Sequence, residues 1–511
     1  MNKRWLFFFI VSITALFLSG AIHAALSPAD DYRAERAKLT GADRATRLGA
    51  DLFLNKKEQV VDEYLTALRS RINNDYLKKN DFPPAKMFYQ VKTQIEEDLI
   101  FELLKTMPKG GALHVHTSAS GTAEWIVDTA LQTPDTYLCW QDKCHYWDGD
   151  DYPKGTLVVA RNRPRGFITI AEAKKVENLR EELIRMLTIG LEEDALPDIW
   201  VEFENIFNRA GNFLNYKPVF EKYFHHAMTI LAEDNVQYLE YRGGMSPYED
   251  LSGKKYTAQD MITTLRDIAH QVAKEYPGFK MKLILAAHRS ATSEKVTEKL
   301  ATATRLYQDK ALRDEGHPFI IGFDLVGQED NGYKTIDYLD VWLKARREGN
   351  DIPFYFHDGE SAWFFDDNLY DTVIDPIASR RIGHGFNLFR FPSVLEKVKE
   401  KDIALEICPI SNQVLRYVGD LRLHPGAEYI NRGEPVVLSS DDPSIFGYRG
   451  LTYDFWAAYM AWGFDLRTLK KLALNSLTYT GMDQQEKTEA IAQWQRKWNT
   501  WIETVYAQAK K

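Results

Sequence analysis

Two histidines stand one residue apart at the end of a short apolar run, residues 111–116. In a β-strand successive side chains point to opposite faces, so His114 and His116 project from the same face. Two imidazoles on one face of a strand end suit a divalent ion such as zinc, provided that other segments supply further ligands. The pair therefore predicts half of a metal site.

Three further apolar runs end in residues that hold metals or move protons. They end in His357-Asp358-Gly359-Glu360, in Gly383-His384-Gly385 and in Ser439-Ser440-Asp441-Asp442-Pro443. Each signal is weak alone, because an isolated strand-end histidine is often structural and an Asp-Asp-Pro sequence commonly forms a turn or a helix cap. Their joint occurrence along the chain favours one shared site.

Short apolar runs alternate with potential helices from residue 238 onward. After residues 111–116, these runs cover residues 238–241, 281–286, 319–325, 353–357, 381–383, 403–408 and 435–439. Strands that alternate with helices predict a parallel sheet, and eight such units close a (β/α)8 barrel. The predicted fold class is therefore α/β, a TIM barrel whose strand ends bring the candidate residues to one mouth.

Three other segments complete the predicted organisation. Residues 1–24 have the pattern of an export signal, with Lys3 and Arg4 before an apolar run too short to span a membrane and Ala24 at the cleavage site. Residues 25–105 are helical in pattern and form either a dimerisation arm or a plain cap. The barrel domain then covers residues 106–511, with an insertion at about 131–197.

The composition is that of a globular protein, with 45% hydrophobic residues, 27% charged residues and a formal net charge of -9. Loss of Lys3 and Arg4 with the signal would make the charge -11, because no acidic residue leaves with them. No long basic run indicates a nucleic-acid partner, and no later segment is a candidate membrane span.

Cysteine and tryptophan positions give structural rather than catalytic predictions. Cys139 and Cys144 lie close together in the insertion, where export permits a disulfide, although with His145 they could instead contribute to a small metal site. Cys408 lies in an apolar run and is expected to be buried and unreacted. A stripe of tryptophans at helical spacing, Trp494, Trp498 and Trp501, predicts core packing rather than a binding cage.

The strand-end motifs resemble those of the adenosine deaminases of the amidohydrolase superfamily, and specifically their secreted branch, the adenosine deaminase-related growth factors. The matching stretches are Met107-Pro108-Lys109-Gly110, Gly322-Phe323-Asp324-Leu325-Val326-Gly327, His357-x-Gly-Glu360, Arg381-Ile382-Gly383-His384-Gly385, Glu406-Ile407-Cys408-Pro409-Ile410-Ser411-Asn412-Gln413 and Ser439-Ser440-Asp441-Asp442-Pro443. The helical arm and the insertion also resemble the secreted branch, which uses its arm for dimerisation.

This resemblance implies one zinc ion, held by His114, His116, His357 and Asp441, with a position left for water. Zinc lowers the pKa of a bound water from about 15.7 to about 7, which supplies hydroxide at neutral pH. Glu360 would act as the general acid that protonates purine N1 while C6 is attacked. His384 would orient the hydroxide, and Asp442 would accept a hydrogen bond from the water or from purine N7.

The resemblance also implies residues that bind the nucleoside. Gly327 would offer its backbone N–H to purine N3, where a larger side chain would crowd the ring. For the ribose, the family's histidine and glutamate are most nearly matched by His288 and Glu204. Glu202 competes with Glu204 for that role, and either glutamate could be a solvated helix charge.

Two positions depart from the family's pattern. Thr117, Ser118 and Ala119 stand where the family usually has an aspartate that contacts the ribose 5′-hydroxyl, and Asp358 replaces a small residue. The metal ligands and the acid are intact. The departures therefore bear on ribose affinity and on the preference for adenosine over a 5′-substituted nucleoside.

The sequence thus predicts an exported, periplasmic or secreted zinc enzyme that deaminates adenosine and 2′-deoxyadenosine to inosine and ammonia, as a homodimer. A deaminase of another aminopurine or of a 5′-modified nucleoside is an alternative, as is an extracellular signalling or binding factor. Glu360, Gly327 and Asp442 together favour a purine deaminase, and the unbroken ligand set argues against a degenerate scaffold. The insertion could bind an additional partner.

Overall fold

The computed structural model describes residues 27–145, 151–244, 246, 248–363 and 367–511 of the chain, which divides into two compact units, Met1–Arg47 and Leu48–Lys511. In the first unit, helix α2 (Pro28–Thr46) begins where the Ser27 hydroxyl accepts the amide of Asp30. The predicted export signal lies outside the described residues. Among the described residues, no helix combines the length and apolar character needed to cross a bilayer.

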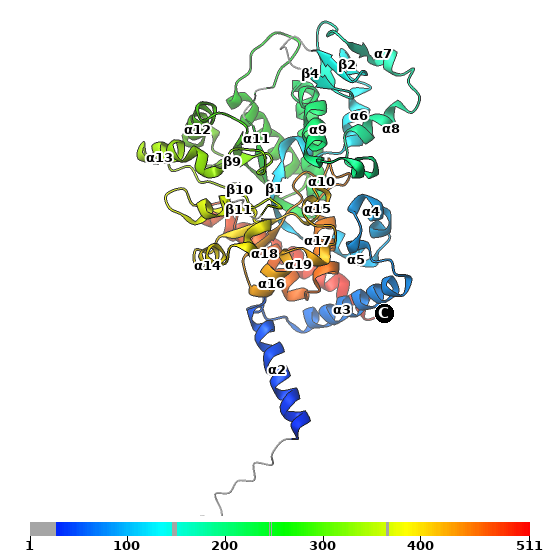
Figure 1. The fold of residues 1–511 in the computed structure, drawn as a ribbon, viewed down its shortest axis with the longest axis vertical. Helices are drawn as coiled ribbons and strands as arrows, with labels where there is room; N and C mark the ends of the chain where they lie inside the picture. The colour runs from blue at the N-terminus through cyan, green and yellow to red at the C-terminus, as the bar shows by residue number, and fades with distance from the viewer. Residues whose placement is uncertain (1–26, 146–150, 245, 247, 364–366) are drawn as a thin grey trace, which may run out of the picture. The chain divides into compact units, whose positions relative to one another are not determined.

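Eight parallel strands form the centre of the second unit (Figure 1). One sheet pairs β1 (Gly110–His116), β7 (Val236–Gly243), β8 (Lys280–His288) and β9 (Ile320–Val326), and the other pairs β10 (His357–Asp358), β11 (Arg381–His384), β12 (Ala404–Ile407) and β13 (Val436–Leu438). Parallel bridges join the sheets at both edges, between Val115 and Asp441 and between Phe323 and Phe354. The eight predicted strands and the predicted α/β fold class are confirmed.

Helices follow the strands and cover the outside of the sheet. They are α10 (Lys217–Glu233), α11 (Ala258–Glu275), α12 (Ser293–Gln308), α13 (Leu339–Arg347), α14 (Pro392–Glu400), α15 (Pro409–Val414), α16 (Gly426–Arg432), α17 (Thr452–Trp462) and α18 (Leu466–Thr478). In α11, Thr257 and Asp260 form a capping box, and residues such as Leu265, Ile268 and Val272 bury one apolar stripe. An apolar stripe of this kind packs a helix against the outside of the barrel, so the site forms at the ends of the strands.

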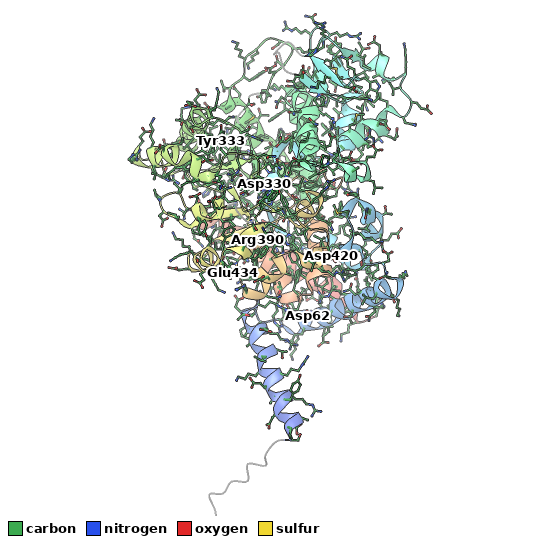
Figure 2. The ribbon with its side chains drawn as sticks, in the orientation of Figure 1. Asp62, Asp330, Tyr333, Arg390, Asp420 and Glu434 are labelled. Carbon is green, nitrogen blue, oxygen red and sulfur yellow. A yellow bond between two sulfur atoms is a disulfide. The ribbon has the colours of Figure 1, made fainter. Side chains whose placement is uncertain are left out.

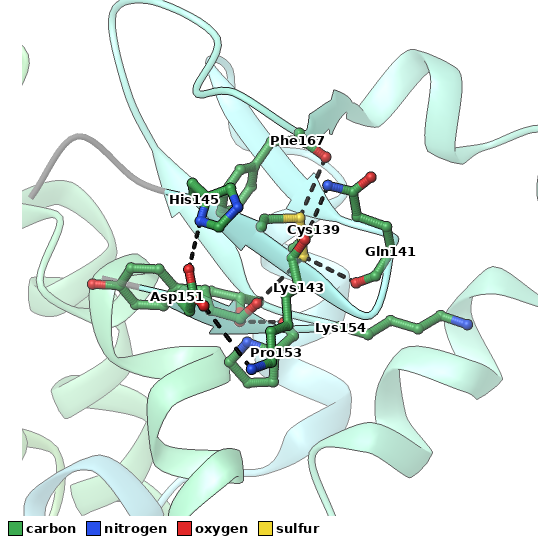
Figure 3. Close-up of a disulfide and its surroundings, with 12 residues drawn as sticks. Cys139, Gln141, Lys143, His145, Asp151, Pro153, Lys154 and Phe167 are labelled. Atoms are coloured by element: carbon green, nitrogen blue, oxygen red, sulfur yellow. Dashed lines mark hydrogen bonds and ion pairs between the residues drawn. A yellow bond between two sulfur atoms is a disulfide. The ribbon is translucent and has the colours of Figure 1, made fainter. Parts of the chain in front are cut away.

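The region after β1 folds into two small antiparallel sheets. One contains β2 (Thr136–Cys139), β5 (Leu157–Val159) and β6 (Phe167–Thr169), and the other contains β3 (Lys143–His145) and β4 (Asp151–Pro153). Cys139 and Cys144 form a disulfide, which confirms that prediction (Figure 3). His145 pairs instead with Asp151, at 2.5 Å between Nδ1 and Oδ1, so the alternative metal site with the two cysteines is wrong.

Short helices follow the two small sheets. They are α7 (Ile170–Ala173), α8 (Leu179–Met186) and the 3-10 helix η3 (Leu191–Ala195), before α9 (Ile199–Leu214). Cys408, at the end of β12, is buried and free, as expected. The exact limits of the arm and of the insertion stay predictions.

The last helix, α19 (Gln484–Ala509), packs against α3 (Lys56–Lys79). It also reaches α5 (Leu99–Lys105), where the Trp501 indole donates to the carbonyl of Leu103 at 3.2 Å, and α4 (Phe88–Glu96) packs against α5. The tryptophan stripe of α19 is buried, which confirms its packing role. The indole of Trp498 donates to Glu58 Oε1 of α3 at 2.8 Å, and that of Trp494 donates to the carbonyl of Pro108 at 2.9 Å.

Replacing Trp498 tests this packing. We expect Trp498→Ala to lower the free energy of unfolding by about 3–5 kcal/mol, because it opens a cavity between α3 and α19. Trp498→Phe keeps most of the volume and loses the bond to Glu58, so it should cost only about 1–3 kcal/mol. Denaturant unfolding followed by circular dichroism measures both, and equal losses would contradict a packing role.

Candidate active site

A cavity of about 240 Å³ opens where the barrel strands end. Nine of the ten residues predicted for the site line it, namely His116, Glu204, His288, Gly327, His357, Glu360, His384, Asp441 and Asp442. The tenth, His114, is fully buried beside it, with its ring 4.4 Å from that of His357. The structure therefore brings the predicted residues together, at the mouth where barrel sites form.

Four side chains in and beside this cavity converge with the spacing of metal ligands. His116 Nε2 lies 3.1 Å from Asp441 Oδ1 and 3.2 Å from His357 Nε2, and His114 Nε2 lies 3.3 Å from the same Asp441 oxygen. Ligands at about 2.0 Å from a tetrahedral ion lie about 3.3 Å apart. Within the described part of the chain, buried His114 Nε2 and Asp441 Oδ1 form no hydrogen bond. The set fits a divalent metal ion.

His384 lies beside this cluster and competes with His116 for a place in it. A group of His114, His357, His384 and Asp441 also has its ligand atoms within 4.8 Å of one another. However, His384 Nε2 is 3.9 Å from Asp441 Oδ2 and closer, at 3.4 Å, to Glu360 Oε2. The distances therefore favour His116 as the ligand and place His384 between the cluster and Glu360.

Two histidines of the cluster have carboxylates behind them. His114 Nδ1 and Glu406 Oε2 form a hydrogen bond at 2.8 Å. His357 Nδ1 lies 2.8 Å from Asp324 Oδ2 without the geometry of a hydrogen bond, while the backbone amide of His357 donates to Asp324 Oδ1 at 3.0 Å. Arg242 joins the two carboxylates, with Nη1 2.6 Å from Asp324 and Nη2 bonded to Glu406. Contacts of this kind fix the ring so that Nε2 faces the metal position.

Electrostatics favour the neutral, metal-binding form of His357 and His384. In His114, against the downward effects of burial and of Arg242, the contacts with Asp441 and Glu406 raise the pKa. Burial and the neighbouring His114 lower the pKa of both His357 and His384 well below the usual value, so both imidazoles are neutral. Against the upward effect of burial, Arg242 and Arg381 hold the pKa of Glu406 below its usual range.

Glu360 and Asp442 face the cavity as buried carboxyl groups. Burial and the charge of Asp441 raise the pKa of Glu360 well above the usual value, and the same two causes raise the pKa of Asp442. A carboxyl group in such surroundings can hold a proton at neutral pH and donate it to a bound molecule.

The opposite wall carries the predicted nucleoside contacts. At Gly327 the backbone has a φ of +98°, and a Cβ there would lie 2.5 Å from His288 Nε2, so only glycine fits. His288 Nε2 lies 3.4 Å from Glu204 Oε1. Glu202 pairs instead with Arg209, so Glu204 is the glutamate that reaches the cavity.

An aromatic wall was missed by the sequence analysis. Trp200, Phe203 and Phe207 of α9 line the cavity, and the Trp200 indole donates to the Tyr417 hydroxyl at 3.0 Å. Their i, i+3, i+7 spacing was a signal for an apolar helix face, but not for one that borders a cavity. Flat rings of this kind offer a surface for a planar ligand.

The two departures from the family's pattern have different structural outcomes. Thr117 and Ser118 line the cavity, so that departure changes its surface. The Asp358 side chain instead points away from the cavity and forms a buried ion pair with Arg289. It accepts hydrogen bonds from Arg289 Nη2 at 2.7 Å and from the Thr335 hydroxyl at 2.8 Å. The departure at Asp358 therefore adds no side chain to the cavity.

Fold and cavity together define a (β/α)8 protein with a metal-type cluster at its mouth, and solved structures share that fold. An adenine deaminase from Arthrobacter aurescens is 17% identical, with a TM-score of 0.56 over 78% of this chain and 99% of that chain. A zinc-bound amidohydrolase from Burkholderia ambifaria is 15% identical, with a TM-score of 0.54 over 83% of this chain and 100% of that chain.

Sequence comparison identifies the family. Residues 160–496 match the model described as adenosine deaminase, and residues 7–104 match the adenosine/AMP deaminase N-terminal model. Adenosine deaminase 2 of Homo sapiens is 34% identical over 494 residues, which cover 92% of this chain and 93% of that protein. The chain belongs to the adenosine deaminase family and is a deaminase hydrolase, which confirms the resemblance seen in the motifs.

Replacing Asp324 tests the support behind the cluster. We expect Asp324→Asn to weaken binding of Zn²⁺, used as the probe ion, by about 10–100-fold, because the carboxylate behind His357 is lost. Competition with a chromogenic chelator measures this affinity. Glu434→Gln is the matched control, since Glu434 is also a buried carboxylate but pairs with Lys399 rather than with a residue of the cluster or of its ion network. An equal loss in both variants would contradict the assigned role.

Proposed function

We propose that this chain is an exported, zinc-dependent enzyme that hydrolyses adenosine and 2′-deoxyadenosine to inosine and ammonia. One observation carries the proposal: the buried Glu360 carboxyl, the cluster that fits a metal ion and the backbone of Gly327 all border one cavity. The name of the human relative, adenosine deaminase 2, and the zinc bound to the Burkholderia ambifaria amidohydrolase support it.

One zinc ion would be held by His114, His116, His357 and Asp441. Bound there, the ion supplies a water molecule acidic enough to attack a carbon at neutral pH. His114 and His357 would direct their Nε2 atoms at it, because their Nδ1 atoms face Glu406 and Asp324. Ser411 donates to Asp441 Oδ2 at 2.7 Å and leaves Oδ1 directed at the histidines.

The side chains beside the cluster would carry out proton transfer. Glu360 gives its proton to purine N1, which makes C6 electron-poor enough for water to attack. Neutral His384, between Glu360 and Asp441, accepts a hydrogen bond from the attacking water and stabilises its developing charge. The proton that the water gives to His384 passes to the C6 amino group, which leaves as ammonia. The new C6 hydroxyl returns a proton to Glu360, and inosine remains.

Recognition of the base would use three of its edges. Gly327 N–H donates to N3, the protonated Glu360 donates to N1, and Asp442 contacts N7 or the water. The aromatic wall of α9, formed by Trp200, Phe203 and Phe207, would border the ring, and His288 with Glu204 would bind the ribose. A hydrolase of a simple amide would not need all three base contacts.

Export and assembly complete the proposal. Residues 1–24 would direct export to the periplasm or the medium, and the disulfide between Cys139 and Cys144 supports an oxidising compartment. Residues 25–105 would serve as the dimerisation arm of a homodimer. The insertion, about residues 131–197, would be free to bind an additional partner.

A 5′-modified nucleoside is a second candidate substrate. Thr117 and Ser118 line the cavity and leave an uncharged surface where the family's aspartate would contact the 5′-hydroxyl. A neutral or apolar 5′-substituent would lose little on such a surface, whereas a buried carboxylate would disfavour it.

A substrate panel separates these candidates. The purified protein is incubated with adenosine, 2′-deoxyadenosine, 5′-methylthioadenosine or adenine while purine absorbance is followed. We expect turnover of the first two, loss of turnover after chelator treatment and recovery with added Zn²⁺. Activity on 5′-methylthioadenosine alone would favour the second candidate, and activity on none of the four would refute the proposal.

Glu360→Gln tests the general acid. The variant keeps the shape of the side chain but holds no transferable proton, so kcat should fall by at least about 10²–10⁴-fold. Zinc content and thermal unfolding should match the wild type. Glu204→Gln is the matched control, because it should raise KM more than it lowers kcat. Full turnover by Glu360→Gln would exclude the acid role.

A further inference from the structure

Glu329 is a buried carboxylate beside the site that has no role in the chemistry described above. It follows β9 by three residues and stands two residues after Gly327. Its Oε1 accepts the backbone amide of Glu360 at 2.7 Å, and its Oε2 accepts that of Gly359 at 3.0 Å. One side chain therefore holds two successive amides of the segment that carries the general acid.

The backbone around Glu360 depends on this contact because it belongs to no helix or strand. Strand β10 ends at Asp358, and Gly359 turns the chain with a φ of +82°. A Cβ at Gly359 would lie 2.8 Å from the side chain of Leu369, so the turn requires glycine. Buried amides must find acceptors, and here both find the same carboxylate.

The carboxylate is itself fixed from two sides. Asn368 Nδ2 donates to Glu329 Oε2 at 2.8 Å, while Asn368 Oδ1 accepts the amide of Thr335. Arg289 pairs with neighbouring Asp358 and acts on Glu329 through its buried charge. Glu329 is thus held in one position rather than free to follow a moving loop.

We propose that Glu329 is a positioning residue for the deamination, an inference that rests on the proposed function. It ties the backbone of the acid, Glu360, to the strand-end loop whose Gly327 would contact purine N3. Because N1 and N3 belong to one rigid ring, the donor to N1 must keep a fixed distance from the donor to N3. Glu329 sets that distance, since it shares a loop with one donor and holds the backbone of the other.

Glu329→Gln is the informative change because it alters atoms without altering shape. An amide has only one acceptor oxygen, and its NH₂ group cannot accept a backbone N–H. In the variant the side-chain oxygen should occupy the Oε2 position, because two donors, the Gly359 amide and Asn368 Nδ2, meet there. The NH₂ group then takes the Oε1 position and faces the backbone amide of Glu360. The variant therefore loses the contact that positions the acid.

We expect kcat for adenosine to fall by about 10–100-fold, because a small misplacement of a reacting group lowers the rate by such a factor. KM should change less than about threefold and zinc content should stay at the wild-type level, because neither the ligands nor the ribose contacts are touched. In the Glu360→Gln background, Glu329→Gln should cause no further loss of kcat, because it acts through Glu360.

Glu434→Gln is the matched control. Glu434 is also a buried carboxylate, but it lies near Lys399 and, as Figure 2 shows, well away from Asp330, the neighbour of Glu329. It should keep kcat within about twofold of the wild type. If Glu329→Gln fails to fold, Asn368→Ala removes the amide that fixes Glu329 and should lower kcat by a smaller factor in the same direction.

The outcomes separate this inference from the proposed function. Unchanged kcat in the Glu329→Gln and Asn368→Ala variants of an active enzyme would overturn the inference alone. The inference would also be overturned by an equal fall of kcat in Glu434→Gln or by a loss of zinc from Glu329→Gln. A further fall of kcat when Glu329→Gln is added to Glu360→Gln would overturn it as well. A wild type without deaminase activity would refute the proposed function and the inference with it.

Discussion

The site depends on a buried cation at the centre of the barrel, Arg242. Its guanidinium has no exposed surface and joins Asp324 to Glu406, the two carboxylates that face His357 and His114. A buried charge without partners is very costly, and two buried carboxylates without a cation between them would repel each other and take up protons. Arg242 therefore pairs with both carboxylates at once and positions them against the two imidazoles.

This ion network continues through the interior of the barrel. In most proteins of this fold, branched apolar side chains fill that interior instead. Arg381 joins Glu406 to Glu240, and Glu240 also accepts the hydroxyl of Tyr238 at 2.8 Å. Buried ion pairs contribute little net stability, because desolvation offsets their attraction. Their effect here is to preorganise the ligands, while stability comes from apolar packing elsewhere, such as the contact of α3 with α19.

The sequence was sufficient to predict a site residue where both the type of its side chain and its position along a predicted strand indicated the same site. His114, Glu360 and Asp441 were found because each follows or ends a strand of a recognisable barrel. Trp200 and Phe203 were missed, because a helix face that packs and one that borders a cavity have the same periodicity. Sequence alone could not choose Glu204 over Glu202 either, since the choice depends on how α9 is rotated about its axis.

Support for the reacting groups comes largely from one short segment, residues 324–329. Asp324 orients His357 from within β9, Gly327 borders the cavity, and Glu329 holds Glu360 from the following loop. Asp324 Oδ1 also accepts the backbone amide of His357 at 3.0 Å, so this one segment contacts the backbone at both ends of the stretch from His357 to Glu360. The position of Glu360 relative to His357 is thus set from the neighbouring segment. In the proposed mechanism, metal binding and proton transfer would have separate supports in that segment, Asp324 in the strand and Glu329 in the loop that follows it.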